Sequence, residues 1–298
     1  GASTGNMLVD DQETLAGIFR DAPALIATHC ESSPLIDANL AAALEKYGPE
    51  IPVTEHPNIR SAEACYVSTV LAQELARRYS APLHVLHLST GREMELFEPG
   101  PMNDKLITAE VCVHFLHFDA SHYPTHGNRI KCNPAIKTPA DRAALLQALK
   151  DGRLDIIATD HAPHTAEEKA ATDYRKAPSG LPLVQDALLS VLELHHDGEI
   201  GLEHIVRLTA HNVADRFRVV DRGYLREGYW ADLVLVDMAT PTPATADRVL
   251  SQCGWTPFEG ETFRSSIART IVNGQTVFDG QAIVEADAAM RLEIGVQR

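Results

Sequence analysis

The segment Ala158-Thr159-Asp160-His161-Ala162-Pro163-His164 directly follows the apolar run Leu154-Asp155-Ile156-Ile157. The run has the length of a buried strand, so Asp160 falls where a strand gives way to a loop. In α/β barrels, catalytic groups project from the carboxyl ends of the strands. The sequence therefore predicts that Asp160 lies at an active site.

Short apolar runs alternate with helical patterns over the first two thirds of the chain. The runs are apolar at odd and even positions, as in strands buried on both faces, and they cover residues 24–28, 83–88, 106–113 and 154–158. Helical spacing is found at about residues 33–47, 61–79, 139–150 and 182–194. This alternation predicts an α/β fold with parallel strands. Four strands are compatible with half of a (β/α)₈ barrel or with a doubly wound open sheet, and no G-x-G-x-x-G motif supports dinucleotide binding.

The pattern changes after about residue 218. Residues 230–236 and 268–278 are predicted strands, and Asn273-Gly274 within the second is a strong hairpin signal. Residues 239–246 are rich in Thr, Pro and Ala and are expected to form a surface loop. We therefore predict a domain over residues 1–218 and a small β-rich appendage over residues 219–298.

Charge and cysteine content narrow the class of protein. The 298 residues carry a net charge of −15, which disfavours nucleic-acid and anionic-membrane partners. The partner that we expect is a small-molecule substrate. No apolar run has the length of a membrane span. The five cysteines are odd in number and scattered in spacing, so we do not expect a disulfide framework. Cysteines of this kind are typical of a reducing compartment, and we expect a cytoplasmic location.

Three residues at strand ends are candidate zinc ligands. His29 ends the first apolar run, His87 lies at the end of the second, and Asp160 ends the fourth. Imidazole and carboxylate together suit a catalytic zinc ion. Each has a simpler interpretation, because strand-end histidines are often structural and Asp is a common helix N-cap. The pair His114-x-x-His117 could also bind a metal, but its spacing is common by chance.

Seven stretches of the chain, taken in order, resemble the dihydroorotases of the amidohydrolase superfamily. They are Gly1–Asn6, Thr28–Glu31, His84–Thr90, Lys131–Pro134, Ala158–His164, Ala177–Gly180 and Gly228–Val234. The resemblance implies the C-terminal portion of a (β/α)₈ TIM barrel, about strands five to eight, followed by a small β-sandwich appendage. It also implies the reversible zinc-dependent cyclisation of N-carbamoyl-L-aspartate to L-dihydroorotate in pyrimidine biosynthesis.

The resemblance also assigns roles to individual residues. It implies that Asp160 is a metal ligand and the catalytic proton carrier. The other metal ligands that it implies are His29 and His87, and the substrate-binding residues are Asn133, His164, Ser179 and Gly180. The His-x-His motif of the first barrel strand and the early substrate-binding Arg and Asn do not occur. We therefore expect the remaining ligands of one or two zinc ions upstream of Gly1, in a longer enzyme of which this chain is the C-terminal two thirds.

Two other functions stay open at this point. The chain could be another cyclic amidohydrolase, of the allantoinase or hydantoinase type. It could also be a non-catalytic, dihydroorotase-like subunit that binds aspartate transcarbamoylase, and a homodimer is possible in either case. The retention of His29, His87 and Asp160 favours an enzyme over a scaffold.

Overall fold

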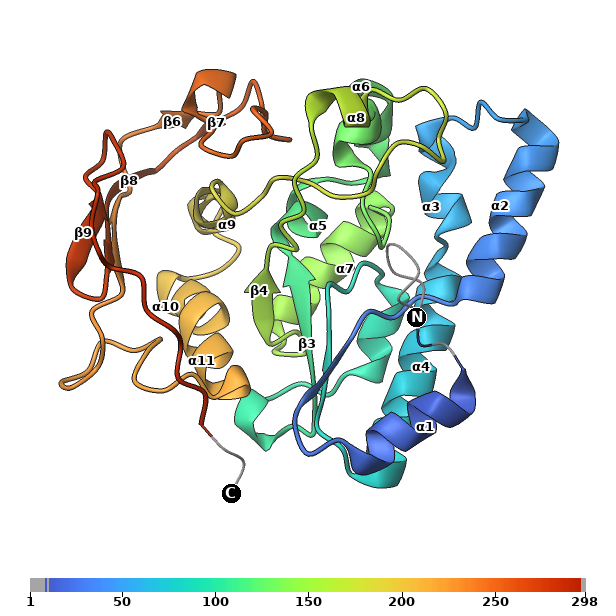
Figure 1. Ribbon diagram of the computed structural model, residues 1–298, viewed down its shortest axis with the longest axis horizontal. Coiled ribbons are helices and arrows are strands. Elements are labelled where there is room, and N and C mark those ends of the chain that lie inside the picture. Colours follow the sequence, from blue (N-terminus) through green and yellow to red (C-terminus); the bar gives the residue numbers. More distant parts are fainter. Residues whose placement is uncertain (1–8, 10, 296–298) are drawn as a thin grey trace. The chain divides into compact units, whose positions relative to one another are not determined.

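A parallel four-stranded sheet organises the first half of the chain (Figure 1). The structure is a computed structural model and describes Val9 and residues 11–295. The strands lie in the order β1-β2-β3-β4, and every neighbouring pair is parallel. Their bounds are β1 Ile26–Thr28, β2 Leu83–Val85, β3 Ile107–Cys112 and β4 Ile156–Ala158. All four predicted strands are therefore confirmed, each shorter than its apolar run.

Helices connect the parallel strands, as the alternation of patterns predicts. The longer ones in this half of the chain are α1 Gln12–Asp21, α2 Ser33–Tyr47, α4 Ala62–Tyr79 and α7 Pro139–Lys150. The shorter helical segments are η1 Val53–Glu55, α3 His56–Ile59, η2 Arg92–Leu96, η3 Met102–Asp104, α5 Val113–His117, η4 Ala120–His122, α6 Tyr123–His126, η5 Gly127–Ile130 and α8 Ala166–Lys169. No helix in the described residues has the length and apolar content needed to cross a membrane.

Local sequence signals set the helix ends. The hydroxyl of Ser61 accepts a hydrogen bond from the backbone N–H of Ala64 at the start of α4. At the start of α7, Thr138 and Asp141 form a reciprocal capping box, and Pro139 occupies the first turn. Gly48 ends α2 with φ of 65°, a conformation that glycine adopts without strain.

The core of this half of the chain lies on and beneath the sheet. Both faces of the central strands β2 and β3 are covered, because neighbouring positions such as Val111 and Cys112 of β3 are fully buried, whereas Ala27 of the edge strand β1 is exposed. A second apolar cluster joins α2 to the segments that follow it and consists of Ile36, Ala43, Ile51, Ile59, Ala64 and Tyr174. Burial on both faces explains why the runs lack the polar alternation of a half-exposed strand.

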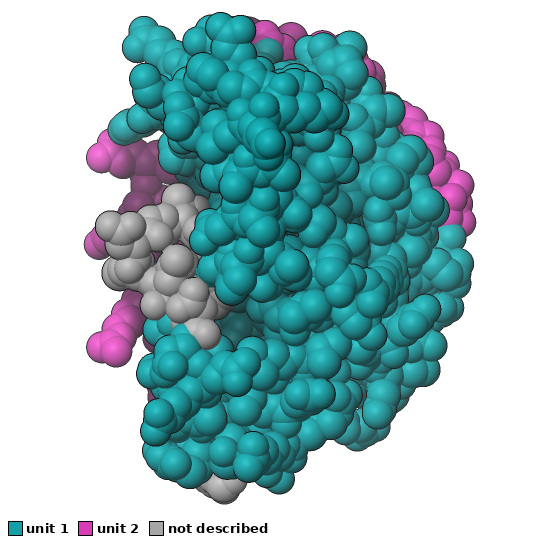
Figure 2. Space-filling model, turned by 90° about the vertical axis from the view of Figure 1, so that its right-hand side faces the viewer, with its two compact units in different colours: residues 1–185, 249–257 teal, residues 186–248, 258–298 magenta. Residues whose placement is uncertain are grey.

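The described chain divides into two compact units (Figure 2). One contains the described residues up to Gln185 together with Val249–Pro257, and the other contains Asp186–Arg248 together with the described residues from Phe258 onward. This division falls earlier in the chain than the predicted boundary at residue 218, because the helices within residues 187–217 belong to the second unit. The assignment of residues 1–218 and 219–298 as functional domains stays a prediction.

The second unit combines helices with antiparallel strands. Its elements are α9 Ala187–His196, α10 Leu202–Val206, η6 Arg207–His211, α11 Asn212–Phe217, β5 Leu233–Asp237, β6 Thr242–Pro243, η7 Ala246–Arg248, β7 Thr262–Phe263, β8 Ser266–Val272 and β9 Gln275–Phe278. Strands β5, β8 and β9 form one antiparallel sheet, and β6 pairs with β7. The predicted β-rich character is thus seen, whereas its assembly into a sandwich stays a prediction.

The predicted hairpin is confirmed at Asn273-Gly274, which joins β8 to β9. Both residues have positive φ, 51° and 80°, as a two-residue hairpin turn of this kind requires. The segment 239–246, expected to be a loop, contains the short strand β6, whose Thr242 pairs with Phe263. A two-residue strand has too few positions to show a period, which explains why the sequence did not indicate it.

Candidate metal and substrate site

The carboxyl ends of β1 and β2 bring His29 and His87 together. Thr28 is paired with Val85 in the parallel register, so His29 and His87 leave the sheet at the same edge. The Nδ1 atom of His29 lies 3.1 Å from the Nε2 atom of His87. Two of the three predicted ligands, separated by 58 positions in the sequence, therefore face each other through ring nitrogens.

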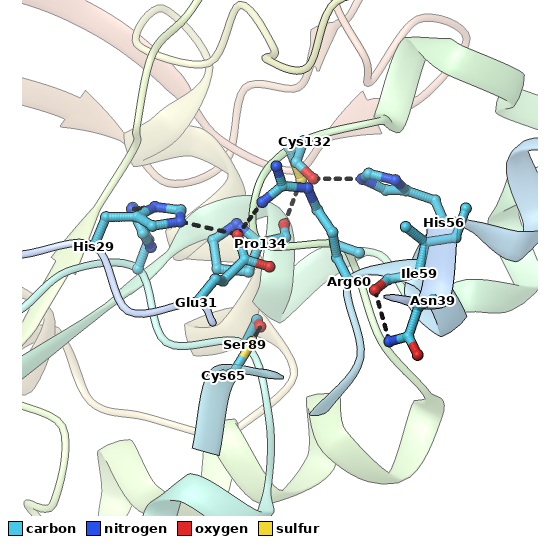
Figure 3. A network of polar contacts seen from close by, with 12 residues as sticks. His29, Glu31, Asn39, His56, Ile59, Arg60, Cys65, Ser89, Cys132 and Pro134 are labelled. Carbon is cyan, nitrogen blue, oxygen red and sulfur yellow. Dashed lines mark hydrogen bonds and ion pairs between the residues drawn. The ribbon is translucent and has the colours of Figure 1, made fainter. Parts of the chain in front are cut away.

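Glu31 fixes the orientation of the His29 ring. Its Oε2 atom lies 2.9 Å from the Nε2 atom of His29, and the carboxylate is fully buried (Figure 3). A carboxylate only accepts hydrogen bonds, so Nε2 of His29 carries the proton and Nδ1 presents a lone pair toward His87. This is the tautomer in which Nδ1 can bind a cation.

Arg60 keeps Glu31 ionised. Burial alone raises the pKa of Glu31, but the hydrogen bond from His29 and the charge of Arg60 outweigh it, and the net pKa lies below its usual value. The Arg60 guanidinium contacts Oε2 of Glu31 directly, as Figure 3 shows. The buried carboxylate is thus charged at neutral pH and compensated by a cation, as buried ions require.

His87 is held in a conformation unusual for its residue type. Its φ is 40°, in the left-handed region, and its side chain is buried. Glu110 accepts a hydrogen bond from the His87 backbone N–H at 3.3 Å and stabilises this turn. Burial, and then the neighbouring His29, lower the pKa of His87, so the imidazole is neutral and able to act as a ligand.

Asp160 follows β4 and also has a positive φ, 49°. Its side chain is exposed, and its negative charge partly offsets the lowering of the His87 pKa, so Asp160 lies near the histidine pair. Within residues 11–295, however, no three His, Cys, Asp or Glu side chains gather closely enough to hold one metal ion. The structure therefore joins two of the predicted ligands and leaves the role of Asp160 as a ligand a prediction.

The histidine pair nevertheless fits a divalent cation such as zinc. Two nitrogens bound to one tetrahedral zinc ion at about 2.0–2.1 Å lie about 3.3 Å apart, close to the observed separation of 3.1 Å. With Nδ1 of His29 carrying a lone pair, the space between the rings takes either a proton on His87 or a cation. A complete catalytic site needs at least one further protein ligand beyond this pair.

Two of the predicted substrate residues, His164 and Gly180, lie side by side. A methyl group placed on Gly180 would come within 3.2 Å of Cδ2 of His164. The backbone N–H of Gly180 donates to the carbonyl of Lys131, two residues before Asn133. The Oδ1 atom of Asn133 is buried and accepts no hydrogen bond from the described residues, so it is available to a ligand. Ser179 is half-buried beside Gly180.

Several residues that support this region were not predicted. Glu31 could have been found, because it is an acidic residue only two positions after His29 at the end of β1. Lys131 and Lys169 are buried, and their ammonium groups bind backbone carbonyls of the loop around Gly180. Burial lowers the pKa of Lys131 to about 8 and that of Lys169 to about 7. No pattern in the sequence indicates these long-range contacts.

His114 is a further buried imidazole of this half of the chain. It is 1% exposed, and neither ring nitrogen has a hydrogen-bond partner among the described residues. Burial, and to a smaller extent His87, lower its pKa to about 3. The sequence left a metal role for His114 as the lesser interpretation, and in the structure the ring is a neutral group inside the core.

The chain belongs to the amidohydrolase family, whose model matches residues 83–277. A dihydroorotase of Halobacterium salinarum is 34% identical over 96% of this chain and 65% of its own length. A dihydroorotase of Methanothermobacter thermautotrophicus is 31% identical over 91% of this chain and 62% of its length. An allantoinase of Bacillus velezensis is 30% identical over 90% of this chain and 59% of its length. The chain thus spans less than two thirds of these relatives.

The fold is that of known cyclic amidohydrolases. The L-hydantoinase of Arthrobacter aurescens superposes with a TM-score of 0.86 at 22% identity, over 96% of this chain and 64% of that protein. The dihydropyrimidinase of Brevibacillus agri superposes with a TM-score of 0.84 at 23% identity, over 95% of this chain and 63% of that protein. At these identities the likeness establishes the fold, and the substrate must be argued from the site.

Replacing Gly180 by Ala tests the close packing of the loop that carries Ser179 and Gly180. The added Cβ would lie 2.5 Å from the carbonyl oxygen of Ala162, and φ of 145° is itself unfavourable for alanine. We expect Gly180→Ala to lower the free energy of unfolding by about 1–3 kcal/mol through overpacking, measured by urea denaturation. Gly100→Ala is the control, since its φ is 126° and no atom lies within 4 Å of the new Cβ. Equal losses in the two variants would show that the contact with Ala162 does not matter.

Replacing His114 by Phe tests the burial of a neutral imidazole. The unfolded chain has an ordinary histidine pKa of about 6.5, so between about pH 3 and 6.5 it binds one more proton at this position than the folded chain. Stability is therefore complete above about pH 6.5 and falls as the pH drops. We expect metal-free protein to lose about 2 kcal/mol more than His114→Phe between about pH 6.5 and 5. If the free energy of unfolding depends on pH in the same way in the parent and in His114→Phe, the imidazole of His114 is not buried in its neutral form.

Proposed function

We propose that this chain forms the metal-binding and substrate-binding part of a dihydroorotase, which interconverts N-carbamoyl-L-aspartate and L-dihydroorotate. The observation that carries the proposal is the pair of facing ring nitrogens of His29 and His87, held by a buried carboxylate at the ends of adjacent strands. The dihydroorotases among its relatives support the choice of substrate. The barrel position of the sheet, as strands five to eight, is part of the same proposal.

His29 and His87 would hold a zinc ion through the nitrogens that face each other. Zinc, when bound, would lower the pKa of a coordinated water to about 7 and polarise the amide carbonyl. Glu31 keeps His29 in the tautomer that leaves Nδ1 unprotonated, and Glu110 holds the turn that presents His87.

Asp160 moves the proton in the proposed reaction. In the hydrolytic direction, a carboxylate oxygen of Asp160 accepts a proton from the attacking water as the new C–O bond forms. The same carboxyl group then donates this proton to the ring nitrogen as the C–N bond breaks, and ring closure follows the reverse path. The free Oδ1 of Asn133, the ring of His164 and the backbone around Ser179 and Gly180 would hold the pyrimidine ring.

A second candidate is the ring opening of allantoin, because an allantoinase matches the chain at 30% identity. The first experiment is therefore a ring-opening assay of the purified protein, as its organism makes it, on dihydroorotate, allantoin and hydantoin. We expect the highest kcat/KM for dihydroorotate. Preference for allantoin or hydantoin would reject the dihydroorotase proposal in favour of another cyclic amidohydrolase, and no turnover of any substrate would favour the scaffold interpretation.

Replacing Asp160 by Asn tests the proton carrier. Asn also tolerates the left-handed conformation at this position, so the fold should be retained. Loss of the general acid–base group is expected to lower kcat for dihydroorotate about 10²–10⁴-fold. Asp221→Asn is the matched control, since Asp221 is also exposed and has φ of 52°. Activity of Asp160→Asn equal to that of the control would remove Asp160 from the mechanism.

A further inference from the structure

The loop that carries Ser179 and Gly180 is fastened by a buried lysine. The Nζ atom of Lys169 lies 3.0 Å from the carbonyl oxygen of Lys131 and 2.9 Å from those of Pro178 and Gly180. Lys169 is the last residue of α8 and is 3% exposed. The three hydrogens of an ammonium group thus match three carbonyl acceptors.

These three carbonyls belong to two segments that are distant in the sequence. Lys131 precedes Asn133, whereas Pro178 and Gly180 flank Ser179. The Lys131 carbonyl also accepts the backbone N–H of Gly180 at 2.9 Å, so the two segments meet at this one oxygen. Lys169 therefore fixes the distance between the segment of Asn133 and the segment of Ser179, which carry the proposed substrate contacts.

Other buried polar groups secure the same two segments. Nζ of Lys131 lies 2.7 Å from the carbonyl oxygen of Tyr174 and also donates to the Ala177 carbonyl. The Tyr174 hydroxyl lies 2.6 Å from Nδ1 of His56, and Nε2 of His56 donates to the Cys132 carbonyl at 2.7 Å, as Figure 3 shows for the second contact. His56 thus holds the backbone before Asn133, and Lys131 holds the backbone before Ser179.

Burying an ammonium group costs free energy, because the charge loses its contact with water. An apolar side chain at this position would avoid that loss. None of the three carbonyl acceptors of Lys169 bears a full charge, so the group is compensated by aligned dipoles. A cation buried in this way is poor evidence for a gain in stability alone. It does impose one geometry on the loop, because each N–H has a single carbonyl to satisfy.

We propose that Lys169 is a positioning residue for the substrate: its ammonium group clamps the Lys131, Pro178 and Gly180 carbonyls and thereby holds Asn133 and the Ser179–Gly180 backbone at their binding distance. This inference rests on the proposed function for the identity of the substrate. The clamp itself is a property of the described loop and can be measured without turnover.

The first test is hydrogen exchange in Lys169→Met at about pH 6, where the parent side chain is charged. Loss of the clamp should speed exchange about tenfold or more in the segment 177–181, including the N–H of Gly180, with the segment 139–150 of α7 unchanged. Lys176→Met is the matched control, because Lys176 lies in the same loop and is exposed. Unchanged exchange at 177–181, or equal acceleration in α7, would overturn the clamp.

The second test separates binding from chemistry, using the protein as its organism makes it. A residue that only positions substrate contacts should raise KM for dihydroorotate about tenfold in Lys169→Met and leave kcat within about twofold of the parent. Lys169→Gln, which keeps an N–H donor, should give an intermediate KM and serves as the readout if the Met variant folds poorly. A KM equal to that of Lys176→Met, or a loss in kcat alone, would overturn the positioning role.

The two tests fail in different ways. If the parent protein does not open the dihydroorotate ring, the proposed function fails, but hydrogen exchange still tests whether Lys169 holds the loop. If the parent is active and both Lys169 variants match Lys176→Met in KM, the positioning role fails while the proposed function stands.

Discussion

The account depends on the contact between the ring nitrogens of His29 and His87. Parallel pairing of β1 with β2 brings the two residues to one edge of the sheet, and their nitrogens then lie 3.1 Å apart. The Nε2–H of His29 donates to the buried carboxylate of Glu31, and burial keeps His87 neutral. Two ring nitrogens that face each other at 3.1 Å, close to the separation of two nitrogens on one zinc ion, are the chemical basis for proposing a cation there.

The same principle, a buried charge that orients a neighbouring group, is found again at the loop that carries Ser179 and Gly180. Arg60 compensates Glu31, and Glu31 orients His29. On the other side, Lys169 has no charged partner among its three acceptors and instead joins carbonyls of two segments. Each of these groups costs free energy to bury and gives in return a defined position for a neighbouring atom.

Much of the fold could be predicted from the sequence, because its signals are local. Apolar runs identified the four parallel strands, helical spacing over about residues 139–150 indicated α7, and Asn273-Gly274 marked the hairpin. The facing of His29 and His87 also followed, since parallel strands end at a shared edge. The short strand β6 and the boundary between the compact units could not be predicted, because they depend on pairing and packing between segments far apart in the chain.

The site was predictable only in part for the same reason. Ligand types and strand ends are local properties, and they indicated His29, His87 and Asp160. The closeness of Gly180 to His164 and the clamp by Lys169 depend on tertiary contacts that no spacing reveals. Asp160 stands between these cases, because its position at the end of β4 is as expected while its carboxylate does not complete a three-ligand group within the described chain.

X-ray absorption at the zinc edge of the purified protein, as its organism makes it, tests the central claim most directly. The account predicts bound zinc with at least two imidazole nitrogens in its coordination shell, and the loss of one imidazole contribution or of the metal in His29→Ala and in His87→Ala. Zinc whose coordination shell and occupancy are the same in the parent and in both variants would contradict it.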